Sequence, residues 1–291
     1  MPNDNKLCKY LGPLCEKLDN CEHYQKFLKY RDKVLVLSND SLEKTISVAL
    51  ALCFVCAILV SFAAVALRPL QVENKAMDMK KNILDVAGLL QDDTDIHNAF
   101  AQQIEAKLVD VATGDYVDGD VVAYDQRKAA KDPALNLELS KDQDIASIKR
   151  RAKVAKVYLV KDGDAIKSII LPVHGYGLWS TMYGFLALDA DGQTVQSINF
   201  YDQAETPGLG GEVVNPNWRA LWAGKKLYDE SGQVALGLVK GVVDPAKPGS
   251  EYKVDGLAGA TLTSVGVTNL VKYWMGQEGF AAYLDKIKTK G

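Results

Sequence analysis

Cysteine is absent from residues 68–291, because all five cysteines lie within the first 56 residues. This long segment therefore needs no disulfide bond and can fold in an oxidising or a reducing compartment. Histidine is scarce too: the chain has three, and no two of them form a His-x-x-x-His pair. No serine lies in a nucleophile elbow. Because metal and hydrolytic centres depend on such patterns, we expect neither metal ligands nor a catalytic residue in this chain.

Positive charge is not in excess either. The net charge is −3 over 291 residues, and no basic stretch carries interleaved aromatic residues. A surface that binds nucleic acid neutralises phosphates with clustered Lys and Arg side chains. We therefore expect no nucleic-acid partner for this chain.

Charge is missing altogether from Thr45–Leu67. As a helix, its 23 residues would reach about 35 Å, enough to cross a hydrocarbon core of about 30 Å. A cleaved signal peptide ending at Ala64-Val65-Ala66 is the alternative, but the apolar run is long and follows 44 residues. We predict a retained transmembrane helix over 44–67. It lacks the ionisable residues that line ion pathways, so we expect no sodium route within this chain.

The span divides the chain into three expected parts. Residues 1–43 predict a short helical extension, and residues 68–291 are long enough for one large core or for two halves. Basic residues flank the span on both sides, so the positive-inside rule does not decide its orientation. The thiols of Cys8, Cys15 and Cys21 favour a reducing, cytoplasmic side for the extension.

Periodicity predicts an α+β fold for the third part. Asp162-Gly163 and Asp191-Gly192 each lie between two apolar runs, which indicates two β-hairpins. Antiparallel hairpins with helices at both ends favour α+β over alternating βαβ units. The expected strands are 154–160, 165–173, 181–188, 194–201 and 234–242, with turns and short strands over 112–124. The expected helices are 79–90, 95–109, 217–223, 267–274 and 280–287.

Three segments suit a ligand that carries a phosphate and a ring. Asp255–Ser264 places small residues around Thr261 ahead of a helical pattern, where free N–H groups and a positive dipole end attract phosphate. Glu205–Gly211 is glycine-rich and can form an anion-binding concavity, although it is neither a P-loop nor a dinucleotide fingerprint. His174–Gly184 interleaves aromatic residues with glycines and offers a flat slot. Each segment alone also fits a structural role: a helix N-cap, a plain turn and a strand entrance with core aromatics.

Taken together, the span and these three segments resemble the C subunit of the sodium-translocating NADH:quinone oxidoreductase. The resemblance runs from about Ser41 to the C-terminus and includes Gly177–Gly184, Glu205–Gly211 and Asp255–Ser264. It implies one N-terminal transmembrane helix followed by a soluble FMN-binding domain over 68–291, with an antiparallel sheet and flanking helices. The FMN-bearing core would be about 150–291.

The resemblance also implies how the cofactor is held. In the family, a flavin transferase splits FAD and joins FMN by a phosphoester to the last threonine of an Asp-x-x-Ser/Thr-Gly-Ala-Thr pattern, which here is Thr261. Ala258 stands where that pattern usually has Ser or Thr. Asp255 has two interpretations: it assists attachment through the transferase's Mg²⁺, or it stabilises the turn. The other implied FMN-binding residues are Leu178, Trp179, Ser180, Glu205, Thr206, Gly208, Leu209, Gly210, Gly259, Ala260, Thr263 and Ser264.

The implied function is electron relay through covalent FMN in a translocase of the bacterial inner membrane. Its partners would be the other subunits, the flavin transferase and the membrane, with the large domain on the periplasmic side. One alternative is the G subunit of the Rnf electron-transport complex, which shares the Glu205–Gly210 loop and the flavinylation pattern but not the Leu178–Tyr183 run. Another is an anchored, non-enzymatic module that binds a phosphorylated ligand or a partner protein.

Overall fold

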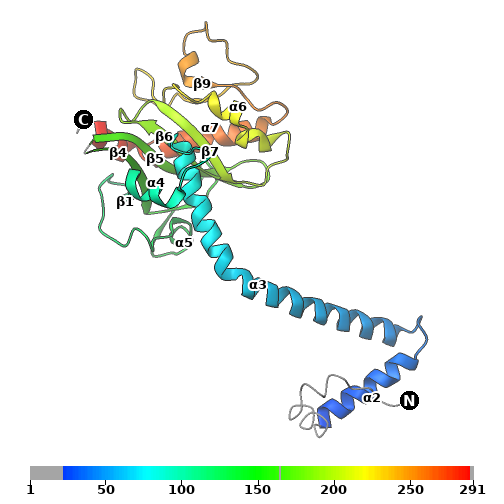
Figure 1. Cartoon of the computed structure of the whole chain (residues 1–291). Helices are drawn as coiled ribbons and strands as arrows, with labels where there is room; N and C mark the ends of the chain where they lie inside the picture. Colours follow the sequence, from blue (N-terminus) through cyan, green and yellow to red (C-terminus); the bar gives the residue numbers. More distant parts are fainter. Residues whose placement is uncertain (1–21, 164, 289–291) are drawn as a thin grey trace. The chain divides into compact units, whose positions relative to one another are not determined.

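The structure is a computed structural model that describes residues 22–163 and 165–288, in two compact units divided after Glu73. The first unit contains α2 (Glu22–Val36) and the first part of α3 (Leu42–Val86), a 45-residue helix that continues through Pro69 (Figure 1). An 18-residue window of α3 has a mean hydropathy of 2.9 and no buried residue, and α3 is the candidate membrane span among the described residues. The predicted apolar helix is thus confirmed, whereas the boundaries 1–43, 44–67 and 68–291 stay predictions. Cys8, Cys15 and Cys21 lie outside the described residues.

The second unit is built on a five-stranded antiparallel sheet in the order β1-β4-β5-β6-β7. Its strands run nearly consecutively, because hairpins join β4 to β5 and β6 to β7 at the predicted Asp-Gly turns. Both hairpins and the α+β class are therefore confirmed. The strands are β1 (Ile104–Asp110), β4 (Val154–Asp162), β5 (Ala165–Tyr176), β6 (Thr181–Asp189) and β7 (Val195–Asp202).

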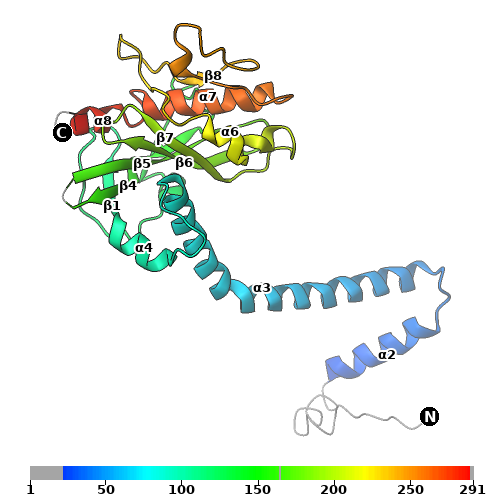
Figure 2. The same ribbon diagram turned by 45° about the horizontal axis from the view of Figure 1, so that its top comes forward.

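Apolar side chains project from both faces of the central strands, because successive residues of a strand point to opposite sides of the sheet. On β5, Ile169 and Leu171 enter the larger core, and Ile170 between them enters the smaller one. The larger core lies under α7 (Thr261–Met275) and α8 (Ala281–Lys288). The smaller core is closed by the last turns of α3 and by α4 (Ile96–Gln103). Figure 2 shows these helices on opposite faces of the sheet.

Short elements connect this framework. The helices are α5 (Gln126–Ala129), α6 (Pro216–Ala220) and the 3-10 turns η1 (Gly210–Val214) and η2 (Ser250–Tyr252). Two small sheets pair β2 (Asn136–Glu138) with β3 (Arg150–Ala152), and β8 (Gly237–Leu238) with β9 (Lys253–Val254). The predicted helices over 267–274 and 280–287 correspond to α7 and α8, and the one over 217–223 overlaps α6.

Two predicted elements are wrong in part. The helix expected over 95–109 ends at Gln103, because Ile104–Asp110 pairs along its whole length with β4. The strand expected over 234–242 shrinks to Gly237–Leu238. Its neighbours bond to separate partners, since Leu236 N–H donates to Leu227 O and Val239 N–H donates to Val254 O. Local apolar pattern predicted neither outcome, because long-range pairing decides both.

Candidate functional site

The N-terminus of α7 presents free backbone donors next to Thr261. The N-cap residue is Ala260, which has no side chain able to cap the helix, and the first N–H bonded within the helix is that of Ser264, to Ala260 O at 3.0 Å. Within the described residues, the N–H groups of Thr261, Leu262 and Thr263 have no acceptor. The Thr261 side chain is exposed. An uncapped helix start with a positive dipole end fits a phosphate group.

Glu205 connects this helix start to the turn between β5 and β6. Glu205 as a whole is 4% exposed. Oε1 accepts from the N–H groups of Trp179 at 2.9 Å and Ser180 at 3.1 Å. The N–H of Leu178 lies 3.1 Å from both carboxylate oxygens. Oε2 also accepts from the Thr263 hydroxyl at 2.7 Å. One buried carboxylate therefore holds two of the predicted segments against the third.

Glycines let the three segments approach this closely. A Cβ on Gly177 would lie 2.6 Å from Glu205 Oε1, and one on Gly210 would lie 2.5 Å from Thr263 Oγ1. Gly259 has a φ of +70°, and a Cβ there would lie 2.9 Å from Leu209 Cδ2. Since only glycine fits these positions without a shift of its neighbours, the glycine spacing in the sequence reflects contact between the loops.

The surface beside Thr261 is apolar and open. Trp179 is 67% exposed, Leu178 40% and Leu209 43%. Two neighbours of Thr261 on α7, Leu262 and Val265, are also exposed and were not among the predicted residues. The sequence could have indicated them, because both are apolar and lie on the helix face opposite Val267 and Leu270. A solvated helix normally carries polar side chains on that face. Such an open apolar surface next to phosphate donors suits a planar ring.

Other predicted residues act within the protein. Asp255 Oδ1 accepts from Val243 N–H at 2.8 Å, which ties this segment to the loop after β8. Ser264 Oγ accepts from Leu257 N–H at 3.0 Å, and Ser180 Oγ accepts from Ala204 N–H at 2.8 Å. Thr206 and Gly208 lie exposed in the turn before η1, where Thr206 O accepts from Gly211 N–H. These groups shape the loops around Thr261.

His174 is part of β5, which continues to Tyr176, past the end of the strand expected over 165–173. Its ring stacks on Tyr183 with centroids 5.2 Å apart and tilts against Trp274 at 4.9 Å. Burial, together with the positive charge of Arg127, lowers the pKa of His174 to about 4, so the ring is neutral at pH 7. The His174–Gly184 segment thus divides into packed strand residues at both ends and an exposed turn between them.

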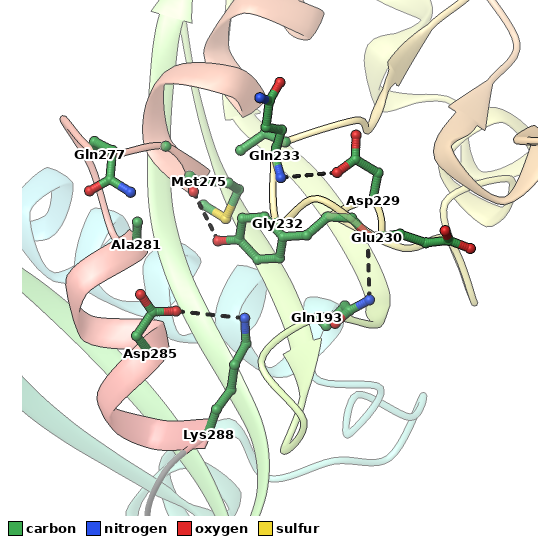
Figure 3. Close-up of a pocket in the computed structure, with 13 residues that line it drawn as sticks. Gln193, Asp229, Glu230, Gly232, Gln233, Met275, Gln277, Ala281, Asp285 and Lys288 are labelled. Atoms are coloured by element: carbon green, nitrogen blue, oxygen red, sulfur yellow. Dashed lines mark hydrogen bonds and ion pairs between the residues drawn. The ribbon is translucent and has the colours of Figure 1, made fainter.

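A cavity of about 550 Å³ lies at the other end of α7, about 21 Å along the helix from Thr261 (Figure 3). Several of its polar groups already have partners in the chain. The Tyr228 hydroxyl donates to Met275 O at 2.8 Å, and Lys288 Nζ lies 4.3 Å from the Tyr228 ring centroid and 3.8 Å from Asp285. Asp229 accepts from Gln233 N–H at 3.0 Å. We therefore place the candidate site at the N-terminal end of α7.

The hydrogen bonds at Glu205 predict a change of stability with pH. Burial alone would raise the pKa of this carboxyl group, but donation from Trp179, Thr263, Leu178 and Ser180 outweighs it and lowers the pKa below 4.5. Because the pKa of Glu205 is lower in the folded state than in the unfolded state, the ionised carboxylate stabilises the fold above pH 4.5. This stabilisation is lost as the pH falls through the folded pKa.

In urea unfolding, the difference in stability between the wild type and Glu205→Gln should therefore narrow as the pH is lowered below 4.5. A constant difference would contradict this, and Glu230→Gln, at an exposed glutamate, is the control.

Gly266 in α7 provides a second prediction. Alanine normally stabilises a helix interior by about 1 kcal/mol over glycine. Here a Cβ would lie 2.5 Å from Tyr176 O and 3.1 Å from Gly177 Cα, both backbone atoms. We expect Gly266→Ala to destabilise the protein by about 1–2 kcal/mol in denaturant unfolding. The exposed neighbour Val265→Ala should change stability by less than about 0.5 kcal/mol. A more stable Gly266→Ala protein would show that α7 does not pack this closely.

Comparison with known families gives the class of this domain. A family model described as "FMN-binding domain" matches residues 177–276. That range begins at the turn held by Glu205 and contains the glycine-rich loop and all of α7. The fold and site thus define an FMN-binding domain behind one candidate membrane helix, and the uncapped α7 start and open apolar surface fit that cofactor.

Relatives identify the family within this class. The C subunit of the Na(+)-translocating NADH-quinone reductase from Vibrio vulnificus is 54% identical over 254 residues, which cover 87% of this chain and 98% of that one. The corresponding protein of Pseudomonas aeruginosa is 49% identical (86% and 98% of the two chains). The crystal structure of Shewanella oneidensis NqrC is 34% identical, with a TM-score of 0.69 over 74% of this chain and 99% of that one. The chain belongs to the family of C subunits of the Na(+)-translocating NADH-quinone reductase, as its motifs predicted.

Proposed function

We propose that this chain carries FMN on Thr261 as a phosphoester and relays electrons within a Na(+)-translocating NADH-quinone reductase of the bacterial inner membrane. The observation that carries the proposal is the exposed Thr261 hydroxyl at an uncapped helix start, beside an open apolar surface. Family membership supports the redox role, and neither the Rnf alternative nor the anchored module is favoured by the relatives. FMN, when bound, supplies the electron-transfer chemistry.

Different residues around Thr261 would bind different parts of FMN. The free N–H groups of Thr261, Leu262 and Thr263 would hold the phosphate at the positive end of α7. Gly259 and Ala260 leave room for the ribityl chain, and Leu178, Trp179 and Leu209 would lie against the isoalloxazine ring. Covalent attachment removes cofactor dissociation, which suits a carrier that both accepts and passes on electrons.

Attachment itself would need help from outside this chain. The Thr261 oxygen would form a bond to the FMN phosphorus of FAD, the diphosphate bond would break, and AMP would leave. A threonine hydroxyl is a weak nucleophile until a base or a metal ion activates it. Among the described residues, no group of His, Cys, Asp and Glu is arranged to hold a metal ion. We assign the activation to the flavin transferase and its Mg²⁺.

The apolar part of α3 would anchor the chain without conducting sodium. Thr45–Leu67 contains no Asp, Glu, Lys, Arg or His, and ion pathways through membranes use such residues. Sodium coupling would therefore reside in other subunits, with this chain as an electron carrier between them. We place the FMN-binding domain on the periplasmic side. A reporter that is active only in the cytoplasm should be silent when fused after Gly291, and activity would refute this orientation.

Intact-mass analysis tests the central claim. The full chain, co-expressed with a flavin transferase and purified in detergent, should exceed its sequence mass by one covalently bound FMN. The denatured chain should keep its flavin fluorescence in a gel. A chain at its sequence mass after co-expression with an active transferase would refute covalent attachment.

A further inference from the structure

Glu205 is a buried carboxylate that forms no ion pair with the described residues. It is 4% exposed, and no salt bridge in the described part of the chain includes it. The donors that surround it are the backbone N–H groups of Leu178, Trp179 and Ser180 and the hydroxyl of Thr263. These groups stabilise the ionised form but carry no net charge. The negative charge of Glu205 therefore persists at this place in the fold.

The position of this charge is fixed from three sides. The Leu178–Ser180 turn donates to it from the ring side of the proposed site. Thr263, two residues after Thr261, donates from the first turn of α7, the phosphate side. Gly177 and Gly210 lie so close to the carboxylate that a Cβ on either would approach a carboxylate oxygen to 2.6 and 2.9 Å, respectively. The contact joins the two halves of the proposed site and leaves no room for a ligand between them.

We propose that Glu205 is a positioning residue that holds the Leu178–Ser180 turn against α7. Its fixed negative charge, next to the proposed flavin site, lowers the reduction potential of the flavin. This inference rests on the proposed function, because it requires FMN on Thr261. It assigns Glu205 to the support of the site and not to direct contact with the cofactor.

The sign follows from electrostatics. Reduction adds electrons to the flavin, so a nearby negative charge disfavours the reduced form. Two charges about 10 Å apart at an effective dielectric constant of about 20 change an equilibrium constant by about tenfold. Removing the charge of Glu205 should therefore raise the ratio of reduced to oxidised FMN at a fixed applied potential by about tenfold, which is about 30 mV for a two-electron couple.

Three variants separate charge from position in the full chain, co-expressed with the transferase and purified in detergent. Glu205→Gln keeps the shape and removes the charge, Thr263→Val keeps the charge and removes the link to α7, and Glu205→Asp keeps the charge on a shorter side chain. Redox titration followed by flavin absorbance gives the midpoint potential, and intact mass gives the yield of attachment. Glu230→Gln, an exposed glutamate at the far cavity, controls for net charge.

We expect a raised potential in Glu205→Gln alone, and a reduced attachment yield at the wild-type potential in Thr263→Val. A flavinylated Glu205→Gln protein at the wild-type potential would overturn the charge effect, and full attachment in Thr263→Val would overturn the positioning role. If Glu205→Gln accumulates without FMN, titration of the wild type against pH decides. A midpoint potential that rises by more than the flavin's own proton uptake requires, as the pH falls through the folded pKa of Glu205, supports the charge effect. The flavin's own pH dependence alone would overturn it. Absence of FMN from the wild-type chain would instead refute the proposed function.

Discussion

Thr261→Ala should leave the chain with no covalently bound flavin while the fold stays intact. The Thr261 hydroxyl is exposed and has no hydrogen-bond partner in the described part of the chain, so its removal costs the folded state little. The oxygen of the same hydroxyl forms the proposed bond to the FMN phosphate. No neighbouring hydroxyl can replace it, because Thr263 and Ser264 are buried and are hydrogen-bonded to Glu205 and Leu257, respectively. The loss should therefore be complete, as measured by intact mass and in-gel fluorescence.

Thr261→Ser is the matched variant for this test. It keeps a hydroxyl at the same position and removes one methyl group, so some covalent FMN should remain. Both variants should unfold within about 0.5 kcal/mol of the wild type, because a surface substitution outside a packed contact has a small effect. Retention of covalent FMN in Thr261→Ala would place the attachment elsewhere in the chain and remove the basis of the proposed site.

The elements predicted from the sequence are those determined by local chemistry. Asp162-Gly163 and Asp191-Gly192 specify hairpin turns through positive φ at Gly163 and Gly192, and both hairpins form as expected. The apolar face of α7 is likewise evident from its spacing. The strand at Ile104–Asp110 and the short β8 could not be predicted in this way, because their hydrogen-bond partners lie far along the chain.

In the candidate site too, local motifs could be predicted from the sequence, whereas long-range contacts could not. Motif order placed Thr261, Glu205 and the Trp179 turn in one site, and the hydrogen bonds bring these segments together. The pattern did not reveal that Glu205 faces inward, since its partners are 25 to 58 residues away in sequence. Nor did it reveal that Ala260 leaves the α7 start uncapped, because a Thr or Ser cap is equally compatible with that stretch.

Asp85→Ala should destabilise the FMN-binding domain by about 2–3 kcal/mol in urea unfolding. Asp85 lies in the last turn of α3, where its Oδ2 accepts from Arg219 Nη2 at 2.6 Å and from Asn199 Nδ2 at 2.8 Å. Arg219 is only 16% exposed, so the variant would leave its guanidinium group half-satisfied, with the bond from Nε to Ile198 O remaining. Because Asp85 is 34% exposed, we expect less than the full cost of breaking a buried ion pair.

Asp78→Ala is the matched control, because Asp78 lies two turns earlier on the same helix and is exposed, and its side chain has no partner in the described part of the chain. It should change stability by less than about 0.5 kcal/mol. Asp85→Asn should fall between the two, since an amide oxygen still accepts from Asn199 but carries no charge for Arg219. Equal stability of the Asp78→Ala and Asp85→Ala proteins would show that apolar packing of Ile83, Leu84 and Val86 alone fixes the end of α3 to the sheet. A difference of the expected size would show that the network from α3 to β7 and α6 holds the smaller core closed.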